Sequence, residues 1–181
     1  MYKRQEGYLA ASPTGLAAAL KGRQVAQEAG VALALTLSDV SMIQFCKGGL
    51  DAMLGDGVDY LFCNLEEAQV WCGTEDLDAI RASLKKMAKM VCLTRGPDGS
   101  EILTADASCH VPAEKVKAID TNGAGDMFAG AFLYAITRGH SPEQAASLGN
   151  HAAAAVVSQH GNRLTLGQLS AIKAYALPPL K

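Results

Sequence analysis

The residues best suited to chemistry lie in one stretch, residues 118–137. An apolar lead-in is followed by a turn that holds Gly123 and Gly125, and then by apolar residues three and four apart, as on one buried helix face. The two glycines therefore stand where a loop enters a helix. The first N–H groups of a helix have no intrahelical acceptor, so they favour an anion, and glycine lets the backbone approach that anion closely.

Asp126 falls in the first turn of this predicted helix, beside the proposed anion site. A carboxylate at this place stays ionised and can still take a proton from a neighbouring hydroxyl. Backbone amides for an anion, together with one carboxylate base, are what phosphoryl transfer to an alcohol requires. The alternative is that Asp126 only caps a buried helix, because Asp is common at that position.

The whole string Asp-Thr-Asn-Gly-Ala-Gly-Asp, residues 120–126, resembles the C-terminal signature of the ribokinase-like, or PfkB, family of sugar and nucleoside kinases. With Asn in third place it is most similar to adenosine kinases and their bacterial relatives. The resemblance implies that Asp126 is the catalytic base. It also implies that the amides of Gly123, Ala124 and Gly125 form the anion hole for the transferred phosphoryl group. The glycine spacing fits neither the dinucleotide-binding fingerprint nor a P-loop.

A second motif, Asn-Leu-Glu-Glu, puts Asn64 at a strand exit and Glu67 in the first turn of the next helix. One interpretation is a helix cap completed by Glu67. An Asn-x-x-Glu element also stands at this place in the ribokinase-like family. The resemblance then implies that Asn64 and Glu67 arrange Mg²⁺ around the nucleotide phosphates through its waters, which Mg²⁺ usually keeps.

A third motif begins at Thr94 and resembles the family's Thr-x-Gly-x-x-Gly loop, with Gly96 and Gly99 as its glycines. The resemblance implies that the two glycines pass close to the ribose and phosphates of ATP. Pro-Asp-Gly is also a strong turn signal between two strands, and both interpretations can hold together. Arg95 is either a neighbour of a nucleotide phosphate or a surface residue.

Two more positions come from the resemblance alone. Asn150, on a long Ala-rich helix, matches a place where family members line the adenine pocket, and the alternative is an exposed helical Asn. Asp120 and the region of Gly161 resemble the part of some members that binds a monovalent cation such as K⁺. His151 and His160 are nine residues apart, which does not suit a zinc site on one helix face.

The order of elements predicts an α/β fold with a largely parallel sheet. Strands are predicted at residues 7–11, 31–37, 58–63 and 90–94, and a hairpin at 101–103 and 108–111. Helices are predicted from Ser12–Pro13 to about residue 29, in short pieces over 40–54, from residue 65, over 76–89, over the organising stretch, and after the capping boxes at Ser141 and Thr165. Residues 177–181 are expected to be a loose tail. Since ligands bind beyond the carboxyl ends of such strands, Asn64, Thr94 and the Gly123 turn are expected to face one crevice.

Composition narrows the function classes. The 16 basic and 18 acidic residues nearly balance, which does not indicate a nucleic-acid partner. No apolar run reaches the roughly 18 residues of a membrane span, and the first residues lack a hydrophobic signal core. The five cysteines contain no C-x-x-C pair and stand mostly in apolar strings, as reduced core thiols do. The simplest interpretation is a cytoplasmic protein.

The resemblance covers nearly the whole chain from about Gly7, but not the glycine-rich segment and small β-sheet lid with which family members begin. We therefore expect residues 1–181 to form a single partial domain: the C-terminal, ATP-binding portion of a ribokinase-like α/β kinase, with its sheet flanked by helices and its lid missing. Residues 1–5 fall outside the resemblance and are interpreted as a cloning or assembly scar. The missing units would expose a sheet edge, so homo-oligomers or aggregates are expected.

The resemblance implies a kinase that uses ATP and Mg²⁺ to phosphorylate a hydroxyl of a nucleoside, with adenosine favoured, or of a sugar. The competing hypothesis is a truncated, non-catalytic module that binds a nucleotide but lacks the acceptor site. The 181-residue chain alone is expected to be inactive in either case, because the missing segment supplies most acceptor contacts in the family.

Overall fold

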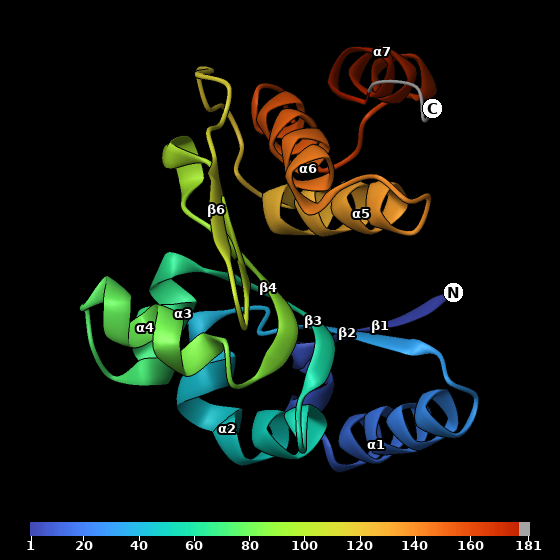
Figure 1. Ribbon diagram of the computed structural model, residues 1–181, viewed down its shortest axis with the longest axis vertical. Helices are drawn as coiled ribbons and strands as arrows, with labels where there is room; N and C mark the ends of the chain where they lie inside the picture. The colour runs from blue at the N-terminus through green and yellow to red at the C-terminus, as the bar shows by residue number, and fades with distance from the viewer. Residues whose placement is uncertain (178–181) are drawn as a thin grey trace. The chain divides into compact units, whose positions relative to one another are not determined.

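The computed structural model describes residues 1–177 of the chain. Within these residues, six strands form one sheet in the order β1-β2-β3-β4-β5-β6. Figure 1 colours the elements along the chain from the N-terminus to the C-terminus. The chain forms two compact units, which we call the first unit (residues 1–93 and 103–108) and the second unit (residues 94–102 and 109 onward). The cysteines all lie in the described part and are free thiols.

The first three strands of the first unit are parallel and follow one another in sequence. β1 pairs in parallel with β2, and β2 pairs in parallel with β3. Parallel neighbours need a crossover between them, and a helix supplies each one. The bounds are β1 (Tyr2–Glu6), β2 (Ala32–Thr36), β3 (Val58–Asn64) and β4 (Ala88–Thr94). The predicted α/β fold with a largely parallel sheet is thus confirmed.

The crossover helices begin at residues that the sequence marks as caps. Ser12 accepts a hydrogen bond from the Gly15 N–H ahead of Pro13, and Asp39 accepts one from the Ser41 N–H. The bounds are α1 (Pro13–Glu28), α2 (Val40–Leu54, with a non-helical kink at Cys46), α3 (Leu65–Cys72) and α4 (Leu77–Leu84).

The core of the first unit lies between the sheet and these helices. Leu35, Leu50, Leu61 and Ile80 are almost fully buried and belong to one apolar cluster. Burying a side chain of this size contributes about 1.5–3 kcal/mol each. The core therefore holds the strand ends of this unit in fixed positions.

The second unit holds the outer residues of a hairpin and three helices. The hairpin strands are β5 (Ser100–Thr104) and β6 (Ser108–Val111), whose residues 103–108 belong to the first unit. The other elements of the second unit are a short 3₁₀ turn η2 (Gly96–Asp98), α5 (Ala124–Ile136), α6 (Pro142–Val157) and α7 (Leu166–Ala176). The two predicted capping boxes are present at Ser141 and Thr165. α5 and α6 pack closely: a Cβ on Gly149 of α6 would lie 2.7 Å from the ring of Phe128 on α5.

Two predicted elements were wrong. Residues 7–11 were predicted as a strand, but they form a 3₁₀ helix, η1 (Gly7–Ala11), directly after β1. An apolar run this short is not enough to distinguish a strand from a helical element. Here the chain must turn into the cap at Ser12, and the Gly7 N–H donates to the Ser38 hydroxyl at 2.7 Å.

The helix predicted over residues 76–89 ends earlier, at Leu84. Its last predicted residues have good helix propensity, but Ala88 and Lys89 begin β4. The Val58 N–H donates to the Met87 carbonyl, so pairing with the rest of the sheet overrides local propensity. The tail predicted for residues 177–181 falls, from 178 on, outside the described residues.

Candidate active site

The Asn64–Glu67 element is a complete capping box at the carboxyl end of β3. Asn64 Oδ1 accepts from the Glu67 N–H at 2.8 Å, and Glu67 Oε2 accepts from the Asn64 N–H at 3.1 Å. Asn64 Nδ2 also donates to Glu67 Oε1 at 2.8 Å. Both carboxylate oxygens therefore face Asn64, with lone pairs left for a further donor. This arrangement fits Mg²⁺ held through water better than direct ligation.

Glu67 is unusual among cap residues because it is only 6% exposed. Burial raises the pKa of Glu67 from its ordinary value of 4.5 to about 7, and the nearby charges of Asp39 and Glu66 add to the rise. The Asn64 N–H acts in the opposite direction by stabilising the ionised form. A group with a pKa near 7 can accept or release a proton at physiological pH.

The helix entry at Gly123 has the backbone that the motif predicts. Gly123 is the N-cap of α5 in the left-handed region, with φ 79°, and a Cβ there would lie 2.7 Å from Cβ of Asn162. Glycine is therefore required both by conformation and by space. Gly125 is exposed, and a Cβ on it would meet nothing within 4 Å, so the space beside this residue is open. The Ala124 N–H donates to the Thr121 carbonyl at 3.3 Å, a long bond for a backbone pair.

Asp126 stands in the first turn of α5, and its residue is exposed. Six residues earlier, Asp120 Oδ1 accepts from the Asn122 N–H at 3.0 Å, and its Oδ2 accepts from the Gly161 N–H at 3.3 Å. These two backbone donors lower the pKa of Asp120, and the Asn122 N–H has the larger effect. Asp120 thus ties the turn before α5 to the loop after α6, and its role toward a monovalent cation stays a prediction.

The loop that starts at Thr94 is tight and rests on both of its glycines. Gly96 has φ 57° and Gly99 has φ 89°, and the Arg95 N–H donates to the Gly99 carbonyl at 2.8 Å. A Cβ on Gly99 would lie 2.1 Å from the Val111 carbonyl oxygen. The turn interpretation is confirmed, and the nucleotide interpretation stays a prediction.

Asn150 is buried rather than exposed, with 5% of its surface accessible. Its Nδ2 donates to the carbonyls of Val111 at 2.9 Å and Pro112 at 3.3 Å. The alternative of an exposed helical Asn is therefore wrong. The amide nitrogen serves the segment after β6, so a contact with adenine would have to use another atom of the side chain.

The structure groups the predicted residues in two sets. Asn64 and Glu67 belong to the first unit and contact each other. The remaining residues belong to the second unit: Thr94, Gly96, Gly99, Asp120, Gly123, Ala124, Gly125, Asp126 and Asn150.

One interaction was missed by reading the sequence. Arg95 Nη1 lies 2.6 Å from Glu101 Oε1, and Glu101 is almost fully buried. The available signal was that Glu101 stands in a short predicted strand, directly before the apolar residues Ile102 and Leu103. A carboxylate there needs a partner, and Arg95 is the cation nearest to it in the sequence.

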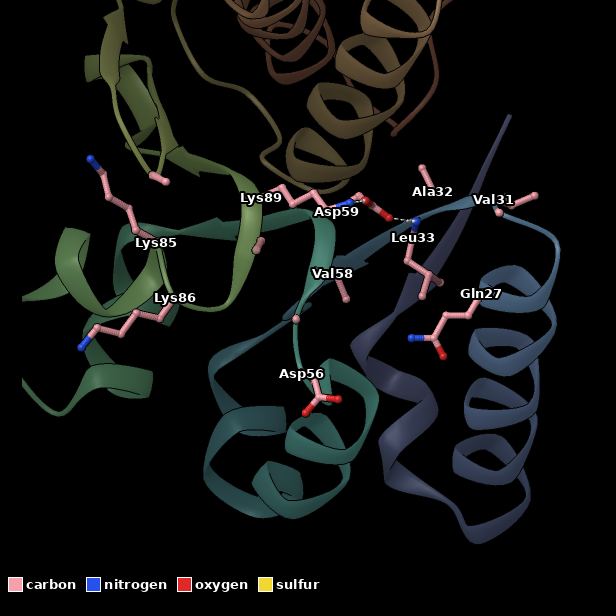
Figure 2. Close-up of a pocket in the computed structure, with 14 residues that line it drawn as sticks. Gln27, Val31, Ala32, Leu33, Asp56, Val58, Asp59, Lys85, Lys86 and Lys89 are labelled. Atoms are coloured by element: carbon pink, nitrogen blue, oxygen red, sulfur yellow. Dashed lines mark hydrogen bonds and ion pairs between the residues drawn. The ribbon is translucent and has the colours of Figure 1, made fainter.

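A cavity of about 650 Å³ lies in the first unit, at the amino ends of the strands (Figure 2). Asp59 crosses its rim, accepting from the Leu33 N–H at 2.7 Å and pairing with Lys89 at 2.8 Å. Figure 2 shows that the charged ends of Lys85 and Lys86 point away from the cavity. Ligands of open α/β sheets bind at the opposite, carboxyl edge, and the cavity contains none of the predicted site residues.

Among residues 1–177, no group of three or more His, Cys, Asp or Glu side chains is arranged to hold a metal ion. In the same part of the chain, none of the helices is both long enough and apolar enough to cross a membrane.

The family model described as pfkB family carbohydrate kinase matches residues 5–168. Among solved structures, adenosine kinase from Sinorhizobium meliloti is similar with a TM-score of 0.90 and 31% identity, over 95% of this chain and 53% of that one. A probable sugar kinase from Rhizobium etli CFN 42 has a TM-score of 0.90 and 33% identity, over 97% of this chain and 54% of that one.

A curated relative, 5-dehydro-2-deoxygluconokinase from Shouchella clausii, is 37% identical over 90 residues, which are 49% of this chain and 28% of the relative. The chain thus spans about half the length of the two solved relatives, and a smaller share of the curated one. The fold is the ribokinase-like α/β fold of these kinases. Because the family model matches most of the residues, the chain belongs to the pfkB family of carbohydrate kinases.

Proposed function

We propose that this chain is the ATP-binding portion of a kinase that transfers the γ-phosphate of ATP to a hydroxyl of a nucleoside or sugar. One observation carries the proposal. An exposed carboxylate, Asp126, stands in the first turn of a helix that opens on a left-handed glycine, with open space over Gly125. Family membership supplies the reaction class.

In the proposed reaction, Asp126 accepts the proton of the acceptor hydroxyl. At the same time the oxygen of that hydroxyl forms a bond to the γ-phosphorus of ATP. The bond from that phosphorus to the β–γ bridging oxygen breaks, and ADP leaves with the bridging oxygen. The N–H groups of Gly123, Ala124 and Gly125 are oriented toward the negative charge on the transferred group. The weak bond of Ala124 to Thr121 must open for its N–H to take part.

The cofactor assignments belong to this proposal as well. Asn64 and Glu67 hold Mg²⁺ through its waters, and the ion when bound neutralises part of the phosphate charge. Thr94, Gly96 and Gly99 line the nucleotide, and Asn150 supports that pocket. Asp120 is the candidate residue for a monovalent cation such as K⁺.

Adenosine is the favoured acceptor. The sequence Asp-Thr-Asn at residues 120–122 resembles adenosine kinases, and the adenosine kinase from Sinorhizobium meliloti is similar over nearly the whole chain. Relatives named 5-dehydro-2-deoxygluconokinase make a sugar acid the competing acceptor. We also propose that the protein is soluble and cytoplasmic.

A second candidate function is a nucleotide-binding module without turnover. It is favoured by the chain spanning only about half the length of its solved relatives. This candidate predicts Mg²⁺–ATP binding that no acceptor converts into ADP release.

The test measures phosphorylation by the full-length gene product that contains this chain, on adenosine, ribose, fructose and 5-dehydro-2-deoxygluconate. We expect Asp126→Asn to keep Mg²⁺–ATP binding and to lose turnover by about 10²–10⁴-fold, the usual contribution of a general base. Glu143→Gln is the matched control, because Glu143 is an exposed first-turn carboxylate of α6 in the same unit. Wild-type turnover in the Asp126 variant would remove this residue from the mechanism.

A further inference from the structure

The Arg95–Glu101 ion pair lies at the base of the loop that the proposed function assigns to the nucleotide. Arg95 Nη1 and Glu101 Oε1 are 2.6 Å apart, and the side chains are 22% and 5% exposed. The pair joins the first residue after β4 to the second residue of β5. It therefore closes the base of a loop only five residues long.

The Glu101 carboxylate governs where the Arg95 guanidinium lies. A buried carboxylate without a cation is strongly disfavoured, and removing one partner of a buried pair costs more than removing both. Within the described residues, Arg95 Nε is also buried and has no hydrogen-bond partner. The guanidinium is thus drawn inward to the carboxylate, at the cost of leaving one of its own donors unsatisfied.

Backbone hydrogen bonds within the loop also hold its shape. The Arg95 N–H donates to the Gly99 carbonyl at 2.8 Å, and the Gly99 N–H donates to the Gly96 carbonyl at 3.1 Å. Gly99 in turn lies against residues 111–113, and the buried Asn150 amide donates to the carbonyls of Val111 and Pro112. To these backbone contacts, the ion pair adds a side-chain link between Arg95 of the loop and Glu101 of β5.

We propose that Arg95 and Glu101 are positioning residues, and that Arg95 does not bind the phosphates directly. Their ion pair holds the backbone of residues 95–99 in the shape that receives the nucleotide. The inference rests on the proposed function for the identity of the ligand, but the claim about loop order can be tested without any nucleotide.

The first measurement is the Kd of Mg²⁺–ATP by calorimetry on the 181-residue chain. We expect Glu101→Gln and Arg95→Gln each to weaken binding at least about fivefold, the lower end of typical coupling between sites. The double variant should be no weaker than either single one, because the interaction is already lost. Arg95→Lys should recover most of the affinity. Asp78→Asn, which removes the exposed Arg81–Asp78 pair, is the matched control and should change nothing.

The second measurement is amide hydrogen exchange without nucleotide. The N–H groups of Arg95, Asp98 and Gly99 all donate within the loop. We expect them to exchange faster in Glu101→Gln and Arg95→Gln, and to stay unchanged in Asp78→Asn. Arg95→Met combined with Glu101→Gln provides a folded reference if a single variant with an unpaired buried charge does not fold.

The outcomes separate the competing explanations. If Arg95→Gln weakens ATP binding while Glu101→Gln leaves it unchanged or tighter, Arg95 is a phosphate ligand and the inference is wrong. Unchanged exchange in both variants would also overturn it. If the wild-type chain binds no Mg²⁺–ATP, the proposed function fails for this chain, and the exchange rates alone decide whether the pair orders the loop.

Discussion

Glu67 combines two properties that rarely occur together at a helix cap. It makes the reciprocal hydrogen bonds of a capping box with Asn64, and it is buried. Most capping carboxylates remain in water, where ionisation costs little. Here burial favours the protonated form, which raises the pKa of Glu67 to about 7.

This raised pKa predicts a pH dependence of stability. In the unfolded chain Glu67 ionises near its ordinary pKa of 4.5, and in the folded chain near about 7. The folded state therefore binds the proton more tightly, and its stabilisation is complete below pH 4.5. As pH rises from 4.5 to 7, the free energy of unfolding should fall by up to about 3 kcal/mol. Chemical unfolding of the wild type and of Glu67→Gln at several pH values measures this fall.

The Gln variant keeps a cap-forming side chain but has no proton to titrate. We expect its stability curve to lack the decline between pH 4.5 and 7, and the difference between the two curves isolates Glu67. Equal slopes in both proteins would contradict the raised pKa. If Glu67 also organises Mg²⁺, the variant should in addition need more Mg²⁺ for half-maximal binding of ATP.

At the scale of single residues, the sequence predicted local pairs better than burial. The spacing of Asn64 and Glu67 was enough to predict the capping box, because its bonds link residues three apart. The burial of Asn150 could not be predicted in this way. It depends on the carbonyls of Val111 and Pro112, nearly forty residues away.

At the scale of elements, two glycines of α5 allow the effect of a side chain on stability to be separated from its effect on the reaction. Gly125 and Gly130 lie in the same helix, and a Cβ on either would meet nothing within 4 Å. Only Gly125 stands in the first turn, where the proposed anion hole lies. Gly123 differs from both, since its φ of 79° and its contact with Asn162 exclude a side chain.

We predict that Gly130→Ala stabilises the protein by about 0.5–1 kcal/mol, as expected inside a helix, and leaves turnover unchanged. Gly125→Ala should melt no lower than the wild type but lose phosphoryl transfer, because its methyl group occupies the open space over the turn. Thermal melting and a coupled ADP-release assay on the full-length gene product measure the two effects. A Gly125→Ala enzyme with normal turnover would show that no anion binds over that turn.

Element boundaries could be predicted where a polar side chain marks them. Ser12, Ser141 and Thr165 each cap the helix that the sequence placed after them. Residues 7–11 and 85–89 lack such a marker, and contacts with other parts of the chain decide them. The Gly7 N–H bonds to Ser38, and the Val58 N–H bonds to the Met87 carbonyl.

At the scale of the whole molecule, the similarity to the two solved relatives extends over 95% and 97% of this chain. It covers only 53% and 54% of the relatives themselves. We predict that the 181-residue chain binds Mg²⁺–ATP weakly and phosphorylates adenosine, ribose and fructose at no useful rate. The orientation of two bound reactants is worth up to about 7–11 kcal/mol, and that advantage is lost when the acceptor is not held.

Calorimetry with Mg²⁺–ATP beside a coupled kinase assay checks this prediction. Robust turnover on any of the three acceptors would show that the acceptor site is complete in these residues. Gel filtration at micromolar concentration tests the accompanying expectation of oligomers. At this scale the sequence was enough to predict the family, because its three motifs are short and stand along the chain in the order that the family has. The identity of the acceptor requires contacts that no motif in the chain describes.

The contact between Gly149 and Phe128 has a consequence for how this sequence can evolve. The ring of Phe128 fills the space that a side chain at position 149 would need, with 2.7 Å between that Cβ and the ring. Phe128 stands two residues after Asp126, so any bulk added on α6 pushes directly on the helix that carries the proposed base. Positions 128 and 149 should therefore change together among homologues, with a smaller residue at 128 wherever 149 is no longer glycine.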